Sequence, residues 1–354
     1  MPKLTERAPI PVQAAVLRAV VALPKRLRRR IAGKPIVIEG QELALDAQLL
    51  LTLNRMSGVT LTEADVATSR AALEAAAGMA GGKPIEDIET REFSIPTPTG
   101  GMRARLYTPE RLDQPAPLLV YYHGGGWVLG SLDTHDHLAR FLARHAGLRV
   151  LSVDYRLAPE HPFPAAVDDA IIGFEYAHAH ADELGIDPAR IAVGGDSAGG
   201  NLAAVVAQHA TRSGGLAPAF QLLIYPEVDF SVRRRSRNLF ADGFFLTSAD
   251  MDFFEAHYVP VGTDKSDPRL SPLCADDLTG LPAACIVTAG FDPLRDSGED
   301  YAAALKKAGV PVVVQRQGDL IHGFVNFIGV GSRFRDATLE IASALRTGLD
   351  LLAP

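Results

Sequence analysis

The sequence predicts an α/β protein whose mostly parallel sheet is covered by helices on both faces. Apolar segments typical of buried strands alternate with helical patterns from about residue 89 onward. These strand segments are apolar throughout, as expected of a sheet without a solvent-facing side. The 354 residues are 47% apolar and 22% charged, a globular composition that can bury one large core.

The first 80 residues differ from the rest because they carry helical patterns only. These patterns cover about residues 11–32, 43–56 and 62–78, and none of them contains a strand pattern or a polar cluster that suggests chemistry. The glycine-rich run from Gly78 to Pro84 then marks a change of character. We therefore expect a helical N-terminal segment that precedes the α/β region.

Eight strands are expected in the α/β region. The first two, Arg91–Pro96 and Met102–Tyr107, flank a Pro-Thr-Gly-Gly turn and are predicted to form an antiparallel hairpin. The other strands are expected at residues 117–122, 149–153, 191–194, 220–225, 283–288 and 311–315, with helices at about 134–146, 165–181, 200–212, 295–308 and 334–351. The segment before residue 283 is too long for a crossover loop. We expect it to be an insertion that packs beside the N-terminal helices as a lid over the carboxyl end of the sheet.

Bulk properties exclude several classes of function. The formal net charge of −7 argues against non-specific nucleic-acid binding, which needs a basic face. No apolar stretch approaches the roughly 18–20 residues of a membrane span, so stable membrane insertion is not expected. The two cysteines, Cys274 and Cys285, have neither CxxC nor zinc-site spacing. They are expected to be reduced and buried, which favours a cytoplasmic location.

The segment Gly195-Asp196-Ser197-Ala198-Gly199 lies between a predicted buried strand and a helical stretch of small residues. Strand, sharp turn and helix are the context of a nucleophile elbow, in which the turn exposes the serine hydroxyl. The flanking glycines would let strand and helix approach closely. A Gly-x-Ser-x-Gly pattern alone is weak evidence, and it gains weight only from the segments described next.

A serine hydroxyl needs a base to accept its proton, and that base needs a group to orient it. Asp292 follows the strand predicted at 283–288, and His322 follows the strand predicted at 311–315. The order Ser, acid, His is typical of nucleophile elbows in this kind of fold. We expect Asp292 to hold the imidazole tautomer and His322 to act as the base toward Ser197. Structural alternatives remain open, with Asp292 as a helix N-cap and His322 as a loop histidine.

A tetrahedral oxyanion also needs hydrogen-bond donors. The run His123-Gly124-Gly125-Gly126-Trp127 follows the strand predicted at 117–122, and consecutive glycines leave backbone N–H groups unobstructed. We expect these glycines and the N–H of Ala198 to form an oxyanion hole. A phosphate-binding loop is the competing interpretation, but the lysine and Ser/Thr of a P-loop are missing.

Taken together, these motifs resemble the bacterial, GDSAG-type branch of the hormone-sensitive-lipase family of serine esterases. The segments that carry the resemblance span roughly residues 90–330 and are His123–Trp127, Asp154–Ala166, Gly195–Gly199, Asp292–Asp296 and His322–Phe324. The resemblance implies an α/β-hydrolase fold with an eight-stranded sheet and a helical cap. It also implies cap helices in residues 1–85, a catalytic domain in residues 86–354 and a cap insertion at about 228–272.

The same resemblance implies the roles of individual residues. The catalytic triad would be Ser197, Asp292 and His322, the oxyanion donors would be Gly125, Gly126 and Ala198, and the substrate pocket would include Trp127 and Asp196. No metal or organic cofactor is implied. The expected function is hydrolysis of short- to medium-chain acyl esters through an acyl-enzyme on Ser197, with a small-molecule ester as partner.

Two other classes of function stay open. An acyltransferase or amidase would use the same triad, and no residue excludes it. A non-catalytic small-molecule receptor on this fold is the second alternative, against which the presence of His322 argues. The last predicted strand, Pro311–Gln315, could pair across a two-fold axis to form a homodimer.

Overall fold

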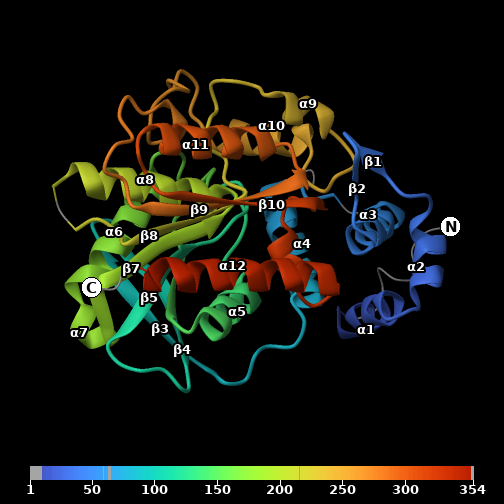
Figure 1. The fold of residues 1–354 in the computed structure, drawn as a ribbon, viewed down its shortest axis with the longest axis horizontal. Helices are drawn as coiled ribbons and strands as arrows, with labels where there is room; N and C mark the ends of the chain where they lie inside the picture. The colour runs from blue at the N-terminus through green and yellow to red at the C-terminus, as the bar shows by residue number, and fades with distance from the viewer. Residues whose placement is uncertain (1–9, 59, 63–64, 215, 352–354) are drawn as a thin grey trace.

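The computed structural model describes residues 10–58, 60–62, 65–214 and 216–351. Its centre is an eight-stranded sheet with the strand order β10-β9-β8-β7-β5-β6-β4-β3 (Figure 1). The six strands from β10 to β6 in this order are mutually parallel. β4 pairs antiparallel with β6, and β3 pairs antiparallel with β4. The strands are β3 (Ile88–Thr97), β4 (Gly100–Pro109), β5 (Ala116–Tyr122), β6 (Arg149–Val153), β7 (Ile186–Asp196), β8 (Phe220–Ile224), β9 (Ala283–Phe291) and β10 (Val312–Ile321).

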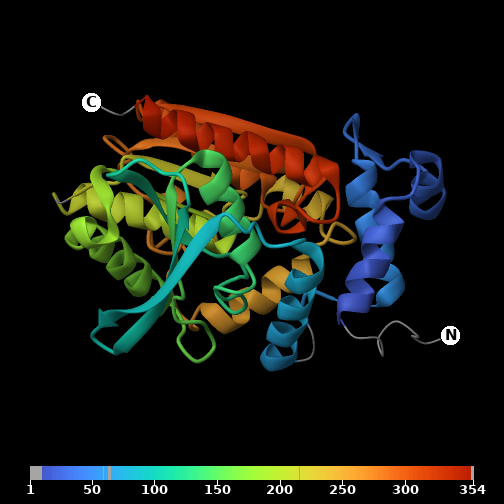
Figure 2. The ribbon, with the colours of Figure 1, turned by 90° about the horizontal axis from the view of Figure 1, so that it is seen from below.

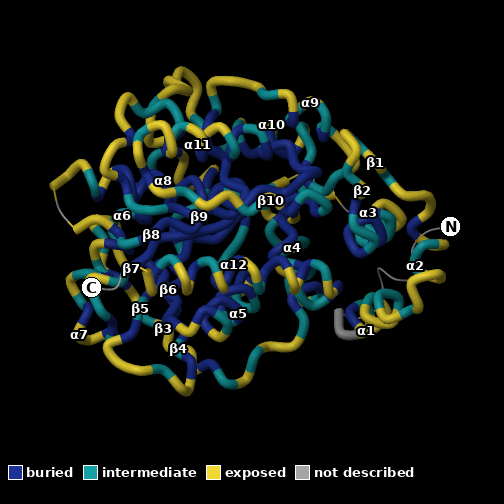
Figure 3. Tube along the Cα trace, in the orientation of Figure 1, coloured by how far each residue is buried: buried dark blue, intermediate teal, exposed yellow. Residues whose placement is uncertain are grey.

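Helices cover both faces of this sheet and create two hydrophobic cores. One face carries α6 (Ala165–Ala179), α8 (Ala198–Arg212) and α11 (Arg295–Lys307). The other carries α5 (Asp136–Ala146) and α12 (Ser332–Asp350), and Figure 1 shows the two groups on opposite sides of the strands. The central strands β6 and β8 are buried along their whole length (Figure 3). The predicted fold class, the eight strands and the antiparallel hairpin are therefore confirmed.

Several strands are longer than the sequence pattern indicated, and in β9 and β10 the extension at the carboxyl end bears on the site. β9 continues from the predicted residue 288 to Phe291, and β10 continues from residue 315 to Ile321. The pairing of β10 with β9 shifts register between Gln317 and Ile321. The residues there are partly polar, so the apolar pattern in the sequence ends before the strand does. The extensions bring Asp292 and His322 directly after a strand end.

The N-terminal segment differs from the prediction in two respects. The single helix expected at 11–32 is two helices, α1 (Ile10–Val21) and α2 (Lys25–Ala32), because Pro24 lies between them and lacks the N–H that a continuous helix needs. A hairpin of two-residue strands, β1 (Val37–Ile38) and β2 (Gln41–Glu42), was not predicted. Strands this short carry no alternation signal.

Two further N-terminal helices follow this hairpin. They are α3 (Leu45–Ser57) and α4 (Val66–Ala80), and the latter begins after Asp65, whose side chain accepts a hydrogen bond from the Thr68 N–H. The Ala44 N–H donates to the carbonyl of Asp319, so this segment is attached near the carboxyl end of β10.

The segment between β8 and β9 contains α9 (Arg235–Leu239), α10 (Ser248–Tyr258) and a short 3₁₀ turn, η1 (Pro272–Cys274). Thr247 and Asp250 form a capping box at the start of α10. The hydroxyl of Thr62, just before α4, donates to the Asp250 carboxylate at 2.6 Å. Figure 2 shows α4 and α10 side by side, so segments almost 200 residues apart in the chain meet here.

The remaining short helices are α7 (Ala181–Leu184), which follows α6, and the 3₁₀ turn η2 (Phe324–Phe327), which follows β10. Among the described residues, no helix combines the length and the apolar character needed to cross a bilayer.

Candidate active site

Ser197 lies on a sharp turn between β7 and α8, and its backbone has φ +56° and ψ −117°. This conformation is sparsely populated for a residue with a side chain and must be enforced by its surroundings. The Ser197 N–H donates to the carbonyl of Ile224 at 2.8 Å. A side chain at Gly195 or Gly199 would collide with the Tyr122 carbonyl, so both flanking positions require glycine. The predicted elbow geometry is present.

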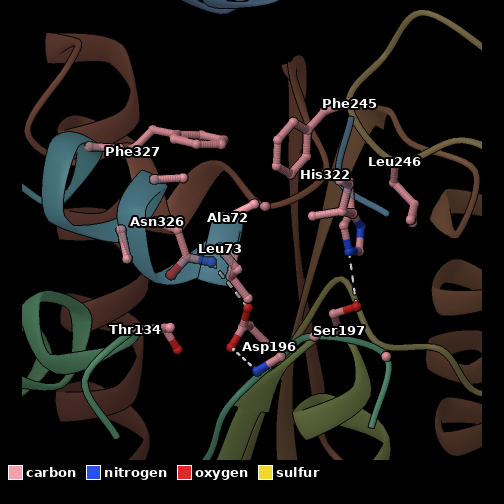
Figure 4. A pocket seen from close by; sticks show the side chains of 18 of the residues that line it. Ala72, Leu73, Thr134, Asp196, Ser197, Phe245, Leu246, His322, Asn326 and Phe327 are labelled. Carbon is pink, nitrogen blue, oxygen red and sulfur yellow. Dashed lines mark hydrogen bonds between the residues drawn. The ribbon is translucent and has the colours of Figure 1, made fainter. Parts of the chain in front are cut away.

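His322 connects Ser197 to Asp292 in one line of hydrogen bonds. Its Nε2 lies 2.9 Å from the Ser197 hydroxyl oxygen, and its Nδ1 lies 2.8 Å from Asp292 Oδ2. Figure 4 shows the imidazole directly above the serine. Asp292 is fully buried, and its other oxygen accepts the Leu294 N–H at 2.8 Å. The carboxylate therefore both orients the histidine and holds the turn before α11, but Asp292 is not the helix N-cap, because that position is Leu294 and no side chain caps the helix.

The glycine loop after β5 presents free donors beside Ser197. Gly125 and Gly126 have φ values of +120° and +61°, and no acceptor for either N–H is found among the described residues. Ala198 is the first residue of α8, so its N–H has no partner within the helix. The three predicted oxyanion donors thus come from two loops that meet at the serine.

Asp196 holds this glycine loop in place. Its Oδ1 accepts the Gly124 N–H at 2.9 Å and the Tyr121 hydroxyl at 2.5 Å, and it lies 3.4 Å from His135 Nε2. Burial alone would raise the pKa of Asp196, but His135 and these hydrogen bonds hold it below the ordinary value. An ionised carboxylate is therefore fixed next to the nucleophile without contacting it.

The neighbouring His123 and Tyr155 complete the support of this loop. Tyr155 donates to the His123 carbonyl at 2.7 Å, and the two rings stack with centroids 4.3 Å apart. Burial and the nearby His135 lower the pKa of His123 to about 3, so its imidazole stays neutral.

Ser197 opens onto a large pocket with a cavity volume of about 140 Å³, whose lining includes Asp196 and His322. Residues of α4, among them Ala72 and Leu73, form its roof together with Leu246 from the insertion (Figure 4). Phe254, also from the insertion, lines the pocket as well. Most of the lining is apolar, which suits a hydrocarbon part of a substrate.

Ser197 also borders a smaller pocket, with a cavity volume of about 40 Å³. Trp127 lines this smaller pocket and is absent from the lining of the large one, whereas Asp196 lines only the large pocket. The two residues predicted for the substrate pocket therefore belong to different hollows.

The sequence patterns did not identify two charged residues of the smaller pocket, Glu227 and Arg237. Glu227 lies just beyond the end of β8, so the strand-end rule that identified Asp292 and His322 applied to it as well. Arg237 lies on α9, inside a basic stretch that gave no sign of facing a pocket. Within the described residues, no group of His, Cys, Asp or Glu side chains is arranged to hold a metal ion.

The site combines a strained serine elbow, a histidine and an acid at two further strand ends, and a glycine loop with free donors, all on a mostly parallel sheet. This combination defines the class of α/β hydrolases. A family model described as "alpha/beta hydrolase fold" matches residues 119–326. The chain belongs to this family, and the resemblance drawn from the motifs is confirmed.

Several relatives are similar over most of the chain. The carboxylic ester hydrolase LipN of Mycobacterium tuberculosis is 48% identical over 90% of this chain and 86% of its own length. The ethyl acetate hydrolase of Pseudomonas putida is 38% identical over 81% of this chain and 91% of its own. The ester hydrolase EH1AB1 from the metagenome of Lake Arreo, solved with a bipyridine phosphonate derivative, superposes with a TM-score of 0.83. It is 42% identical and covers 86% of this chain and 98% of its own.

Proposed function

We propose that this protein is a serine carboxylesterase that hydrolyses short- to medium-chain acyl esters through an acyl-enzyme on Ser197. The observation that carries the proposal is the unbroken line Ser197–His322–Asp292 beside unpaired N–H groups. The relatives named for ester hydrolysis support the same reaction.

The first half of the reaction forms the acyl-enzyme. The Ser197 oxygen attacks the ester carbonyl carbon while His322 Nε2 accepts the hydroxyl proton. The carbonyl oxygen becomes an oxyanion that the N–H groups of Gly125, Gly126 and Ala198 stabilise. Asp292 stabilises the imidazolium through Nδ1. Collapse of the intermediate breaks the ester C–O bond, and His322 gives its proton to the leaving alkoxide.

The second half releases the acid. Water enters the site that the alcohol has left, and His322 removes a proton from it as it attacks the acyl carbon. The oxyanion forms in the same hole, and its collapse returns the proton from His322 to Ser197. The free enzyme is restored, with one ester and one water converted into one acid and one alcohol.

The test is hydrolysis of p-nitrophenyl esters with acyl chains of two to twelve carbons by the wild type and by Ser197→Ala. We expect a maximum at short to medium length and a loss of ~10⁶-fold in kcat in the variant. Activity that persists in Ser197→Ala would contradict the role of this serine. A wild type that hydrolyses none of these esters would favour the receptor alternative.

The proposal extends to a homodimer and a cytoplasmic location. β10 is an edge strand, and Val313 and Val314 on it are exposed. An exposed apolar edge strand can pair with its copy across a two-fold axis. Light scattering tests this, since a monomeric mass would contradict the dimer. The cytoplasmic location rests on the cysteine usage and is tested by cell fractionation.

A further inference from the structure

The two pockets beside Ser197 differ in chemistry. The large one is mostly apolar, whereas the small one places Glu227, Arg237 and the indole of Trp127 around its space. Ser197 and Gly126 line both, so one ester held at the serine reaches into each pocket. The difference in lining predicts that the two halves of the substrate differ in polarity, an inference that rests on the proposed esterase activity.

The polar groups of the small pocket have unused hydrogen-bonding capacity. Arg237 Nη2 is bound to Asp252 at 2.8 Å, but its buried Nε has no acceptor among the described residues. The buried Nε1 of Trp127 also has none. Buried donors without acceptors are rare and costly, so each points to a missing partner. Arg237 and Trp127 both line the small pocket, so a group bound there is the candidate acceptor for these two donors.

Glu227 supplies hydrogen-bond acceptors to complement these donors. Its carboxyl group accepts one hydrogen bond, from the Asp229 N–H at 3.2 Å, and forms no ion pair with Arg237 within the described part of the chain. Burial raises the pKa of Glu227 to about 7, so near neutral pH its carboxyl group both donates and accepts. Glu227 and Arg237 thus both line the pocket without forming an ion pair with each other.

The charges restrict what can bind between them. The charges around the small pocket offset each other, with Arg237 on one side and Glu227 and Glu255 on the other, so a neutral polar group binds there without leaving a charge unpaired. A hydroxyl group is the smallest neutral group that accepts from a buried N–H and donates to a carboxyl oxygen. Leu246, Met251 and Phe254 supply apolar contacts for the few carbons that carry it.

The position of His322 decides which half of the ester this is. His322 lines the large pocket but not the small one, and it must reach the leaving oxygen of the alcohol. The alcohol therefore lies on the side of the large pocket. We propose that the small pocket binds the acyl half of the ester and selects short acyl groups that carry a hydroxyl, through Glu227, Arg237 and Trp127.

The test compares p-nitrophenyl 3-hydroxybutyrate, each enantiomer separately, with p-nitrophenyl butyrate. The leaving group is identical, so the ratio of the two kcat/KM values reports the hydroxyl alone. We expect the wild type to favour one hydroxybutyrate enantiomer about tenfold. Glu227→Leu and Arg237→Met should each reduce this ratio to about one, whereas Glu227→Gln, which still donates and accepts, should keep most of it.

A matched control is Arg233→Met. Arg233 also binds Asp252, at 2.9 Å, but does not line the pocket, so the ratio should stay at its wild-type value. A second control places the hydroxyl on the alcohol and compares 3-hydroxybutyl butyrate with butyl butyrate. Glu227→Leu should leave the ratio of these two kcat/KM values unchanged.

The outcomes separate this inference from the proposed function. Ser197-dependent hydrolysis with equal rates on both acyl esters would overturn the hydroxyl preference and leave the esterase intact. A ratio that survives both Glu227→Leu and Arg237→Met would overturn the role of these residues. A hydroxyl effect confined to the alcohol would overturn the assignment of the pocket. No hydrolysis of any ester would overturn the esterase itself, and the inference with it.

Discussion

The floor and the roof of the large pocket are held in place by different means. The floor consists of Gly124–Gly126, Asp196, Ser197 and His322, with Asp292 behind His322, and all of them lie at or just after strand ends of one sheet. The roof consists of α4, α10 and residues 245–246, which come from the N-terminal segment and the insertion. Backbone geometry fixes the floor, whereas contacts between segments far apart in the chain fix the roof.

The floor is rigid because the residues packed around it fix its backbone conformation. Ser197 has a strained backbone, Asp292 is fully buried and the glycines at 195 and 199 pack against the Tyr122 carbonyl. Such geometry is what preorganised catalysis requires.

The roof depends on individual side chains. Arg70 of α4 donates to the carbonyls of Val128 and Ala158 and to the Glu160 carboxylate. Just before α4, the Thr62 hydroxyl donates to Asp250 of α10 and so connects the two helices of the roof. Single substitutions can therefore move the roof without disturbing the floor.

The largest expected effect belongs to the floor and is produced by Asp292→Asn. The amide oxygen can still accept the Leu294 N–H, but the amide nitrogen donates toward His322 and forces the wrong imidazole tautomer. We expect kcat on p-nitrophenyl butyrate to fall by ~10⁴-fold with little change in melting temperature. A fall of less than tenfold would show that Asp292 serves only to hold the turn before α11.

This contrast explains what could be predicted from the sequence. The floor residues follow strand ends in short motifs whose turns need specific residues, so Ser197, Asp292 and His322 were identifiable. The roof has no such local signature. Residues such as Thr62 and Asp250 meet only because both segments fold over the sheet, and a linear pattern cannot show that.

Smaller features that the sequence did not predict also lack a local sequence pattern. The β1–β2 hairpin is too short for a periodic signal, and Pro24 divides a helical pattern that is otherwise continuous. Glu227 follows a strand, as the floor residues do, but no motif surrounds it. Its importance rests on burial and on Arg237, neither of which is visible in the sequence.

The second prediction concerns the point where floor and roof touch. A side chain at Gly126 would collide with the ring of Phe254 on α10, and the φ of +61° also disfavours alanine. We expect Gly126→Ala to lower kcat by ~10²–10³-fold, because the oxyanion donors are displaced. Kinetics on p-nitrophenyl butyrate measure the loss.

The double variant Gly126→Ala/Phe254→Ala separates the two causes of that loss. Removing the ring relieves the collision but not the backbone strain, so about half of the lost free energy of activation should return. If Phe254→Ala restores nothing, the roof does not press on the oxyanion loop.

The third prediction concerns stability and pH, at the edge of the floor. Burial raises the pKa of Glu227 from 4.5 to about 7, against the lowering effects of the Asp229 N–H and the Arg237 charge and with smaller raising effects from the Asp229 and Asp292 carboxylates. The folded state therefore binds the proton more tightly than the unfolded state. The free energy of unfolding falls as pH rises from about 4.5 to about 7, by up to about 3 kcal/mol.

Glu227→Gln removes this dependence. Urea denaturation at pH 8 should find the variant more stable than the wild type, and the difference should vanish near pH 4.5. Glu110→Gln, at an exposed position, is the matched control and should show no such change. A Glu227→Gln variant that is less stable than the wild type at pH 8 would contradict the raised pKa.

The smallest effect is expected for Arg70→Met, which releases the roof. The methionine keeps the length of the side chain but loses the hydrogen bonds to Val128, Ala158 and Glu160. Arg70 and Glu160 are partly exposed, so we expect a loss of only about 1–2 kcal/mol in the free energy of unfolding. The floor is untouched, so KM should rise about 3–10-fold while kcat changes less than twofold.

The pH dependence of this variant separates the ion pair from the other contacts. The Arg70 guanidinium lowers the pKa of Glu160 to about 2, so the pair contributes stability above about pH 4.5 and loses it as pH falls toward 2. In Arg70→Met this part of the acid sensitivity should disappear, whereas in Glu160→Gln the carbonyl contacts of Arg70 remain and KM should stay near the wild-type value. A fall in kcat at constant KM in Arg70→Met would mean that the roof helps to position the catalytic groups, and that floor and roof are not independent.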